Sequence, residues 1–117
     1  MSDDTFTGIV HKFSLLRALP DGRDLDCYLA IGEDESGTPR VLDLYLGKSG
    51  DELTAHRVLM ELASDLLALD GGIAVVANRL AYQNFLPGGQ VKSDGGIHSC
   101  DSICDYIGKF LKNRYGV

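Results

Sequence analysis

Two short segments of the chain combine residue types that can hold a small anion. The first, Gly47-Lys48-Ser49-Gly50, joins a predicted strand to a predicted helix, where backbone N–H groups and the Lys48 ammonium would form a cradle. It is not a Walker A loop, because Leu42 stands where that motif requires glycine. The same residues also fit a tight turn followed by an S-x-x-E capping box from Ser49 to Glu52. Both interpretations stay open at this point.

The second segment precedes the last predicted helix. His98 and Ser99 come just before it, and Gly88 and Gly89 belong to a glycine-rich stretch over 84–97 that we interpret as a loop. His98 could contact an anion or help to cap the helix, and the loop could bind a ligand or simply connect two elements. The candidate ligand-binding residues are therefore Lys48, Ser49, Gly50, Gly88, Gly89, His98 and Ser99.

The cysteines give a weaker chemical signal. Cys27, Cys100 and Cys104 form no CxxC pair, although Cys100 and Cys104 share one face of the last predicted helix and lie close to His98. Structural zinc usually needs four ligands, whereas a free cysteine on an apolar stripe behaves as a small hydrophobic residue. We therefore expect both to pack in the core, with metal binding or redox chemistry as the alternative. We expect no metal and no cofactor.

Hydrophobic periodicity predicts the elements that must position these residues. Period-2 alternation with short turns predicts an antiparallel meander, and 3–4 spacing predicts helices. Gly71 and Gly72 would end the first helix. The fold class is α+β: a single domain over residues 1–117 with a small antiparallel three-stranded sheet followed by three helices packed on one face. The predicted strands are 6–18, 24–32 and 40–46, and the predicted helices are about 50–69, 73–80 and 100–115.

The two faces of the predicted sheet differ in character. Because apolar residues alternate along the strands, one face gathers leucines and other apolar side chains, and we expect this face to pack against the helices. The opposite face carries Tyr28, Val41 and Tyr45, which are the candidate interface residues because tyrosine is enriched at protein contacts. The inward set is Leu25, Cys27, Leu29, Ile31, Leu42, Leu44 and Leu46.

Charge and composition narrow the classes of partner. The net charge of −6 repels phosphate backbones, so we expect no binding to nucleic acid. No apolar run approaches the roughly 20 residues that cross a bilayer, so we expect no membrane span. Met1 leads into Ser-Asp-Asp without a signal-peptide pattern, and the cysteine count is odd. These features favour a cytoplasmic protein.

Several segments together resemble a known family. In their shared order they are similar to the TSCPD domain, found near the C-terminal end of cobalamin-dependent (class II) ribonucleotide reductases and also as a free-standing protein. The resemblance covers about residues 9–112. The segments that carry it are His11-Lys12-Phe13-Ser14, Tyr28-Leu29-Ala30-Ile31-Gly32, Gly37-Thr38-Pro39, the run 46–53, Asn84-Phe85-Leu86-Pro87-Gly88-Gly89 and the run 102–111.

The chain also departs from that family. The Thr-Ser-Cys-Pro-Asp run that names the domain is His98-Ser99-Cys100-Asp101-Ser102 here, without proline. The reductase's catalytic barrel and its redox-active cysteine tail are missing as well. The resemblance therefore implies an accessory or regulatory role and not the reduction of ribonucleotides.

Three functions follow, in order of preference. The first is a non-catalytic binding module that docks on a protein, such as a subunit of ribonucleoside-diphosphate reductase, or on a second copy of itself as a homo-oligomer. The second is a small nucleotide- or anion-binding protein that uses Gly47–Gly50 and the N-terminus of the last helix. An enzyme is least favoured, because no general base and no nucleophile signature stand out.

Overall fold

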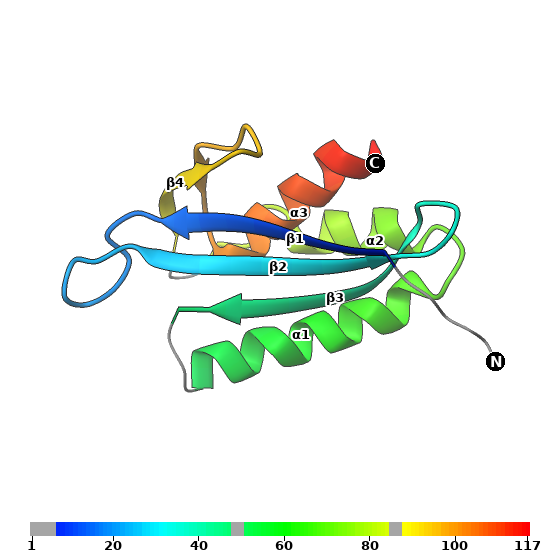
Figure 1. The fold of residues 1–117 in the computed structure, drawn as a ribbon, viewed down its shortest axis with the longest axis horizontal. Helices are drawn as coiled ribbons and strands as arrows, with labels where there is room; N and C mark the ends of the chain where they lie inside the picture. Colours follow the sequence, from blue (N-terminus) through cyan, green and yellow to red (C-terminus); the bar gives the residue numbers. More distant parts are fainter. Residues whose placement is uncertain (1–6, 48–50, 85–87) are drawn as a thin grey trace.

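The fold is an antiparallel sheet with helices along one edge and one face, in a computed structural model that describes residues 7–47, 51–84 and 88–117 (Figure 1). Strands come first along the chain, and two helices separate them from a short hairpin and a final helix. The elements are β1 (Thr7–Leu15), β2 (Leu25–Glu33), β3 (Pro39–Leu46), α1 (Asp51–Leu67), α2 (Gly72–Leu80), β4 (Gly89–Ser93), β5 (Ser99–Cys100) and α3 (Ile103–Tyr115).

The sheet has five strands in the described residues, in the order β3-β2-β1-β4-β5, so the prediction of a three-stranded sheet was wrong. The α+β class was correct. β4 lies in the stretch over 84–97 that glycine content marked as a loop, and β5 lies just after it, where we placed the start of the last helix. β4 pairs with only three residues of β1, from Phe13↔Ser93 to Leu15↔Val91, and only Val91 of β4 is buried. So short a strand needs no alternating apolar pattern, because backbone hydrogen bonds to β1 are enough to define it.

The inward face of the sheet was predicted correctly. All seven of its expected residues on β2 and β3 are buried. The register explains this, because Ile31 lies opposite Leu42 and Cys27 lies opposite Leu46, so apolar side chains meet in pairs on one face. Tyr28, Val41 and Tyr45 are exposed on the other face, as expected.

The last helix begins later than predicted. Ser102 is its N-cap, with an extended backbone and a side-chain oxygen that accepts a hydrogen bond from the N–H of Asp105. Cys100 therefore lies in β5 and does not share a helical face with Cys104, which corrects that prediction. The apolar spacing continued smoothly through Cys100, and periodicity alone could not reveal where Ser102 interrupts the helix.

The first helix ends earlier than predicted, at Leu67. Gly71 has a left-handed backbone with φ of 72° and precedes α2, whose first residue is Gly72. A Cβ on Gly72 would lie 2.0 Å from the carbonyl oxygen of Leu66, so the close approach of the two helices requires glycine there. The predicted capping box at Ser49 lies outside the described residues.

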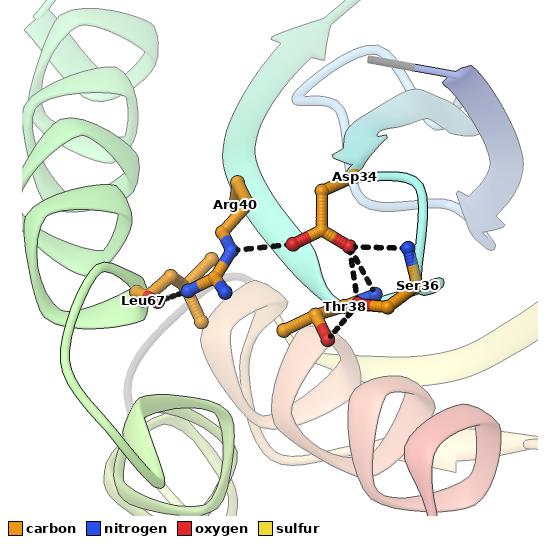
Figure 2. Close-up of polar contacts among 5 residues, drawn as sticks. All are labelled: Asp34, Ser36, Thr38, Arg40 and Leu67. Atoms are coloured by element: carbon orange, nitrogen blue, oxygen red, sulfur yellow. Dashed lines mark hydrogen bonds and ion pairs between the residues drawn. The ribbon is translucent and has the colours of Figure 1, made fainter. Parts of the chain in front are cut away.

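Polar contacts fix α1 along β3, the edge strand. The Ser64 hydroxyl accepts a hydrogen bond from the N–H of Leu42 at 2.9 Å, which partners a backbone group of that edge. At the C-terminal end of α1, Arg40 donates a hydrogen bond to the carbonyl of Leu67 at 2.8 Å and another to Asp34 at 2.9 Å (Figure 2). This guanidinium supplies the positive charge that the last turn of α1 itself lacks.

The β2–β3 turn holds the Arg40 contact in place. Asp34 accepts hydrogen bonds from the backbone and hydroxyl of Ser36 and from the N–H of Thr38, as Figure 2 shows. Hydrogen bonds from Ser36 and Arg40 hold the pKa of Asp34 well below its ordinary value. Asp34 is therefore ionised at neutral pH and connects the turn to the C-terminus of α1 through Arg40.

Candidate functional site

The outer face of the sheet carries a row of cations and aromatic rings. Lys12 lies opposite Tyr28, and Tyr28 lies opposite Tyr45 on the next strand. The Lys12 ammonium is 5.8 Å from the centre of the Tyr28 ring, and the Arg57 guanidinium is 4.8 Å from that of Tyr45. Tyr28 and Tyr45 remain 37 % and 48 % exposed, so the chain's own cations cover both rings only in part.

A polar cleft of about 390 Å³ lies beside this row. Ser14 forms a 2.6 Å hydrogen bond to Asp26 within it. Two ammonium groups and three carboxylates line the cleft, so neither sign of charge dominates and no single ligand charge is selected. The lining residues are Lys12, Ser14, Asp24, Asp26, Lys92, Ser93 and Asp94.

A chain of hydrogen bonds runs from His11 through Tyr106 to Ser93, at the wall of this cleft. Nε2 of His11 is 2.6 Å from the Tyr106 hydroxyl, which donates to Ser93 at 2.7 Å. His11 must therefore donate to Tyr106, and both donors point toward Ser93. Burial lowers the pKa of His11, with Asp94 acting in the opposite direction. Because Ser93 accepts the hydrogen bond from Tyr106, these hydrogen bonds do not activate Ser93 as a nucleophile, which would need a base that accepts its proton.

The same histidine and tyrosine also pack against phenylalanine rings in the core. The Phe13 and Tyr106 rings stack with their centres 3.9 Å apart, and the His11 and Phe110 rings stack at 4.0 Å. These contacts attach α3 to the inner side of β1. The cluster therefore has a structural role between α3 and the sheet.

The N-terminus of α3, one half of the predicted anion site, already holds a carboxylate. Asp105 is fully buried and accepts hydrogen bonds from the N–H groups of Tyr82 and Asp101 and from the Lys109 ammonium. Burial works to raise its pKa, but these donors outweigh burial and lower it. An external anion at this helix end would meet the Asp105 charge, so the geometry disfavours the predicted site.

The glycine and histidine candidates come together in the β4–β5 hairpin instead. Gly89 pairs with Cys100, and the N–H of Val91 donates to the carbonyl of His98 at 2.9 Å. A Cβ on Gly88 would lie 2.5 Å from the carbonyl oxygen of Asp101, so this glycine permits close backbone packing. The side chains of His98 and Ser99 are exposed. Lys48, Ser49 and Gly50 lie outside the described residues.

The cysteine thiols are buried. Cys27, Cys100 and Cys104 are all buried, as expected for core residues, and none of them forms a disulfide within the described residues. Burial raises the pKa of the Cys100 thiol, and it raises that of Cys104 to about 11. A thiol with so high a pKa carries little thiolate at neutral pH and reacts slowly. Within the described ranges, no group of three or more His, Cys, Asp or Glu residues could hold a metal ion.

The outward face of α1 is the feature that sequence analysis missed. The helix buries one stripe, His56, Met60, Ala63 and Leu67, against the domain. A second apolar stripe, which we name the leucine face, points outward and continues into the turn after the helix. Its residues are between 38 % and 60 % exposed, and they are Val58, Leu59, Leu62, Leu66 and Leu69. The sequence contained this signal, because α1 has more apolar positions than one buried stripe needs.

Comparison with known proteins finds no match to a family model, to a curated protein or to a solved structure. The resemblance to the TSCPD domain therefore rests on the chain's own motifs. In the part of the chain that the structure describes, no helix combines the length and the apolar character needed to cross a bilayer.

Proposed function

We propose that this chain is a non-catalytic accessory module that docks on a protein partner through the leucine face of α1. The observation that carries the proposal is the set of five large apolar side chains, each about half exposed, gathered along one helix and the turn that follows it. Scattered exposed apolar residues are normal in proteins, but a contiguous patch usually marks a contact surface.

The apolar surface of the leucine face limits how much it can contribute to the free energy of binding. Full burial of one such side chain contributes roughly 1.5–3 kcal/mol, so burying the exposed parts of all five would contribute roughly 4–7 kcal/mol. A micromolar complex requires about 8 kcal/mol after the costs of association have been met. The leucine face would therefore anchor an interface that also includes neighbouring polar contacts.

The family resemblance indicates which partner to test first. A TSCPD-like chain would act on a cobalamin-dependent ribonucleotide reductase as an accessory domain. The outer face of the sheet, with Tyr28, Val41 and Tyr45, is the second candidate surface for the same contact. Its tyrosines contact Lys12 and Arg57 of the chain itself, so we rank it below the leucine face.

A binding titration against the purified reductase of the same organism tests the proposal. Wild type is compared with Leu62→Gln/Leu66→Gln on α1 and with Tyr28→Asp/Tyr45→Asp on the sheet, after circular dichroism shows that all three fold. We expect the α1 variant to bind roughly tenfold or more weakly, as anchor residues at interfaces do. If only the sheet variant loses binding to the reductase, the contact lies on the outer face of the sheet and not on α1. Equal binding by all three would refute docking through either face.

The same proteins test the nucleotide-binding alternative. If a nucleotide bound at the Gly47–Gly50 segment and the N-terminus of α3, it would raise the melting temperature of wild type further with each increase in its concentration. We expect no such rise, because the α3 half of this site already holds the Asp105 carboxylate. A rise without any reductase binding would replace the docking proposal with the nucleotide-binding one.

A further inference from the structure

Among the described residues, the charged side chains next to the leucine face on its polar edge are acidic. Successive helical residues are rotated by about 100°, so the face spans an arc of about 100° centred on Leu62. Asp65 and Glu61 follow on its polar edge, and both are exposed. Arg57 lies further round the helix, where its guanidinium is held by Asp43 at 2.9 Å. The rim along this edge is therefore acidic, and Arg57, the nearest cation among the described residues, pairs with Asp43 and also interacts electrostatically with Glu61.

The spacing of the leucines is that of a helix-pairing seam. Leu59, Leu62, Leu66 and Leu69 are separated by three, four and three residues, and the exposed Ala55 precedes them by four. This 3–4 repeat is the pattern by which two helices interlock side chains at a shallow angle. Within α1 it runs from Ala55 to Leu66 over about 17 Å, which is about three helical turns, and Leu69 in the turn after the helix extends it further.

We propose that the segment docking on the leucine face is an amphipathic helix of about four turns, whose apolar side is bordered by lysine or arginine residues. This rests on the proposed function and names the chemistry of the partner. The apolar seam accepts the partner's apolar side, and Glu61 and Asp65 face its cations. Such charge complementarity mainly sets specificity and the rate of association.

A second copy of this chain fits the same face poorly. A copy would bring its own Glu61 and Asp65 to the interface, and each chain carries a net charge of −6. Like charges across an interface discriminate against that pairing. Salt separates the two cases, since screening weakens contact with a basic helix and strengthens contact between two acidic chains.

Two synthetic peptides of about 18 residues test the proposal, with identical leucine faces and flanks of either lysine or glutamate. Fluorescence anisotropy measures the affinity of each labelled peptide for the full chain. The variants are Leu62→Gln/Leu66→Gln, Glu61→Lys/Asp65→Lys and a matched control, Asp21→Lys/Glu35→Lys. The control makes the same change in net charge, but in the two hairpin loops instead of on α1.

We expect wild type and the control to bind the lysine peptide roughly tenfold more tightly than the glutamate peptide, with added salt reducing the difference. The Glu61→Lys/Asp65→Lys variant should reverse this preference, and the leucine variant should lose both peptides. Equal, leucine-dependent binding of both peptides would overturn the charge inference alone. Binding of neither peptide, or binding that ignores the leucine variant, would overturn the docking site itself. Light scattering that shows a dimer strengthened by salt and lost in the leucine variant would assign the face to a second copy.

Discussion

Replacing Asp105 with alanine should destabilise the protein strongly. The buried carboxylate accepts hydrogen bonds from the N–H groups of Tyr82 and Asp101 and from the ammonium of Lys109. These bonds attach the segment after α2 and the residue before Ser102 to the first turn of α3. Hydrogen bonds to a charged group contribute about 1.5–3 kcal/mol each, and unsatisfied buried donors carry a penalty of similar size.

The expected loss for Asp105→Ala is therefore roughly 3–5 kcal/mol, because Lys109 can return to water but the two backbone N–H groups largely cannot. For a domain of this size that lowers the melting temperature by roughly 12–20 °C. Urea unfolding followed by circular dichroism measures the loss. Asp101→Ala is the matched control at the same helix end, with an expected loss below about 1 kcal/mol. A loss below about 1 kcal/mol for Asp105→Ala would refute the reasoning.

The effect should also depend on pH, with a definite sign. The pKa of Asp105 in the folded protein is lower than its ordinary value of 3.8, so the folded state favours the ionised form. This contribution to stability is fully present above that ordinary value and is lost as the pH falls through the lower, folded value. The difference in unfolding free energy between wild type and Asp105→Ala should accordingly shrink as the pH is lowered below about 4.

Three further results are expected. Ile107→Ala should cost roughly 2–4 kcal/mol in urea unfolding, because Ile107 is fully buried, and a loss below about 1 kcal/mol would place the core elsewhere. Gly108→Ala should cost roughly 1–3 kcal/mol in the same assay, since the new Cβ would lie 2.2 Å from the backbone nitrogen of Ala81 and force α2 and α3 apart. Cys104 should react with a thiol reagent at neutral pH only as fast as the protein opens, because its thiol is buried and its pKa is raised to about 11; labelling within the mixing time would contradict this.

The first three strands and their faces could be predicted from the sequence because burial on one side leaves a period-2 pattern. Leu25 to Ile31 alternate with exposed or half-buried residues, and a shift of one residue would turn every apolar side chain to water. β4 and β5 leave no such pattern. They are short and rich in small residues. β4 is defined by its pairing with β1, which is distant in the sequence, and β5 by its pairing with β4.

The candidate site was less predictable for two different reasons. Periodicity predicted a helix over about 50–69, but α1 has two adjacent apolar stripes, and spacing cannot tell which one faces the core. The structure buries Met60 and Leu67 and leaves Leu62 and Leu66 outside. At α3, helix-end chemistry indicated an anion site without showing that Asp105 would fold back and fill it.

The polar contacts that attach α1 to the sheet affect how α1 could bind a partner. Ser64 contacts the backbone of β3, Arg57 pairs with Asp43, and Arg40 holds the carbonyl of Leu67. Together with the buried stripe, these contacts fix the helix without using its outward leucines. A surface held in place before binding loses little conformational entropy when a partner arrives, so more of the burial energy remains as affinity. The polar contacts to β3 therefore favour a docking role for α1, since they keep the leucine face in one position while it is open to solvent.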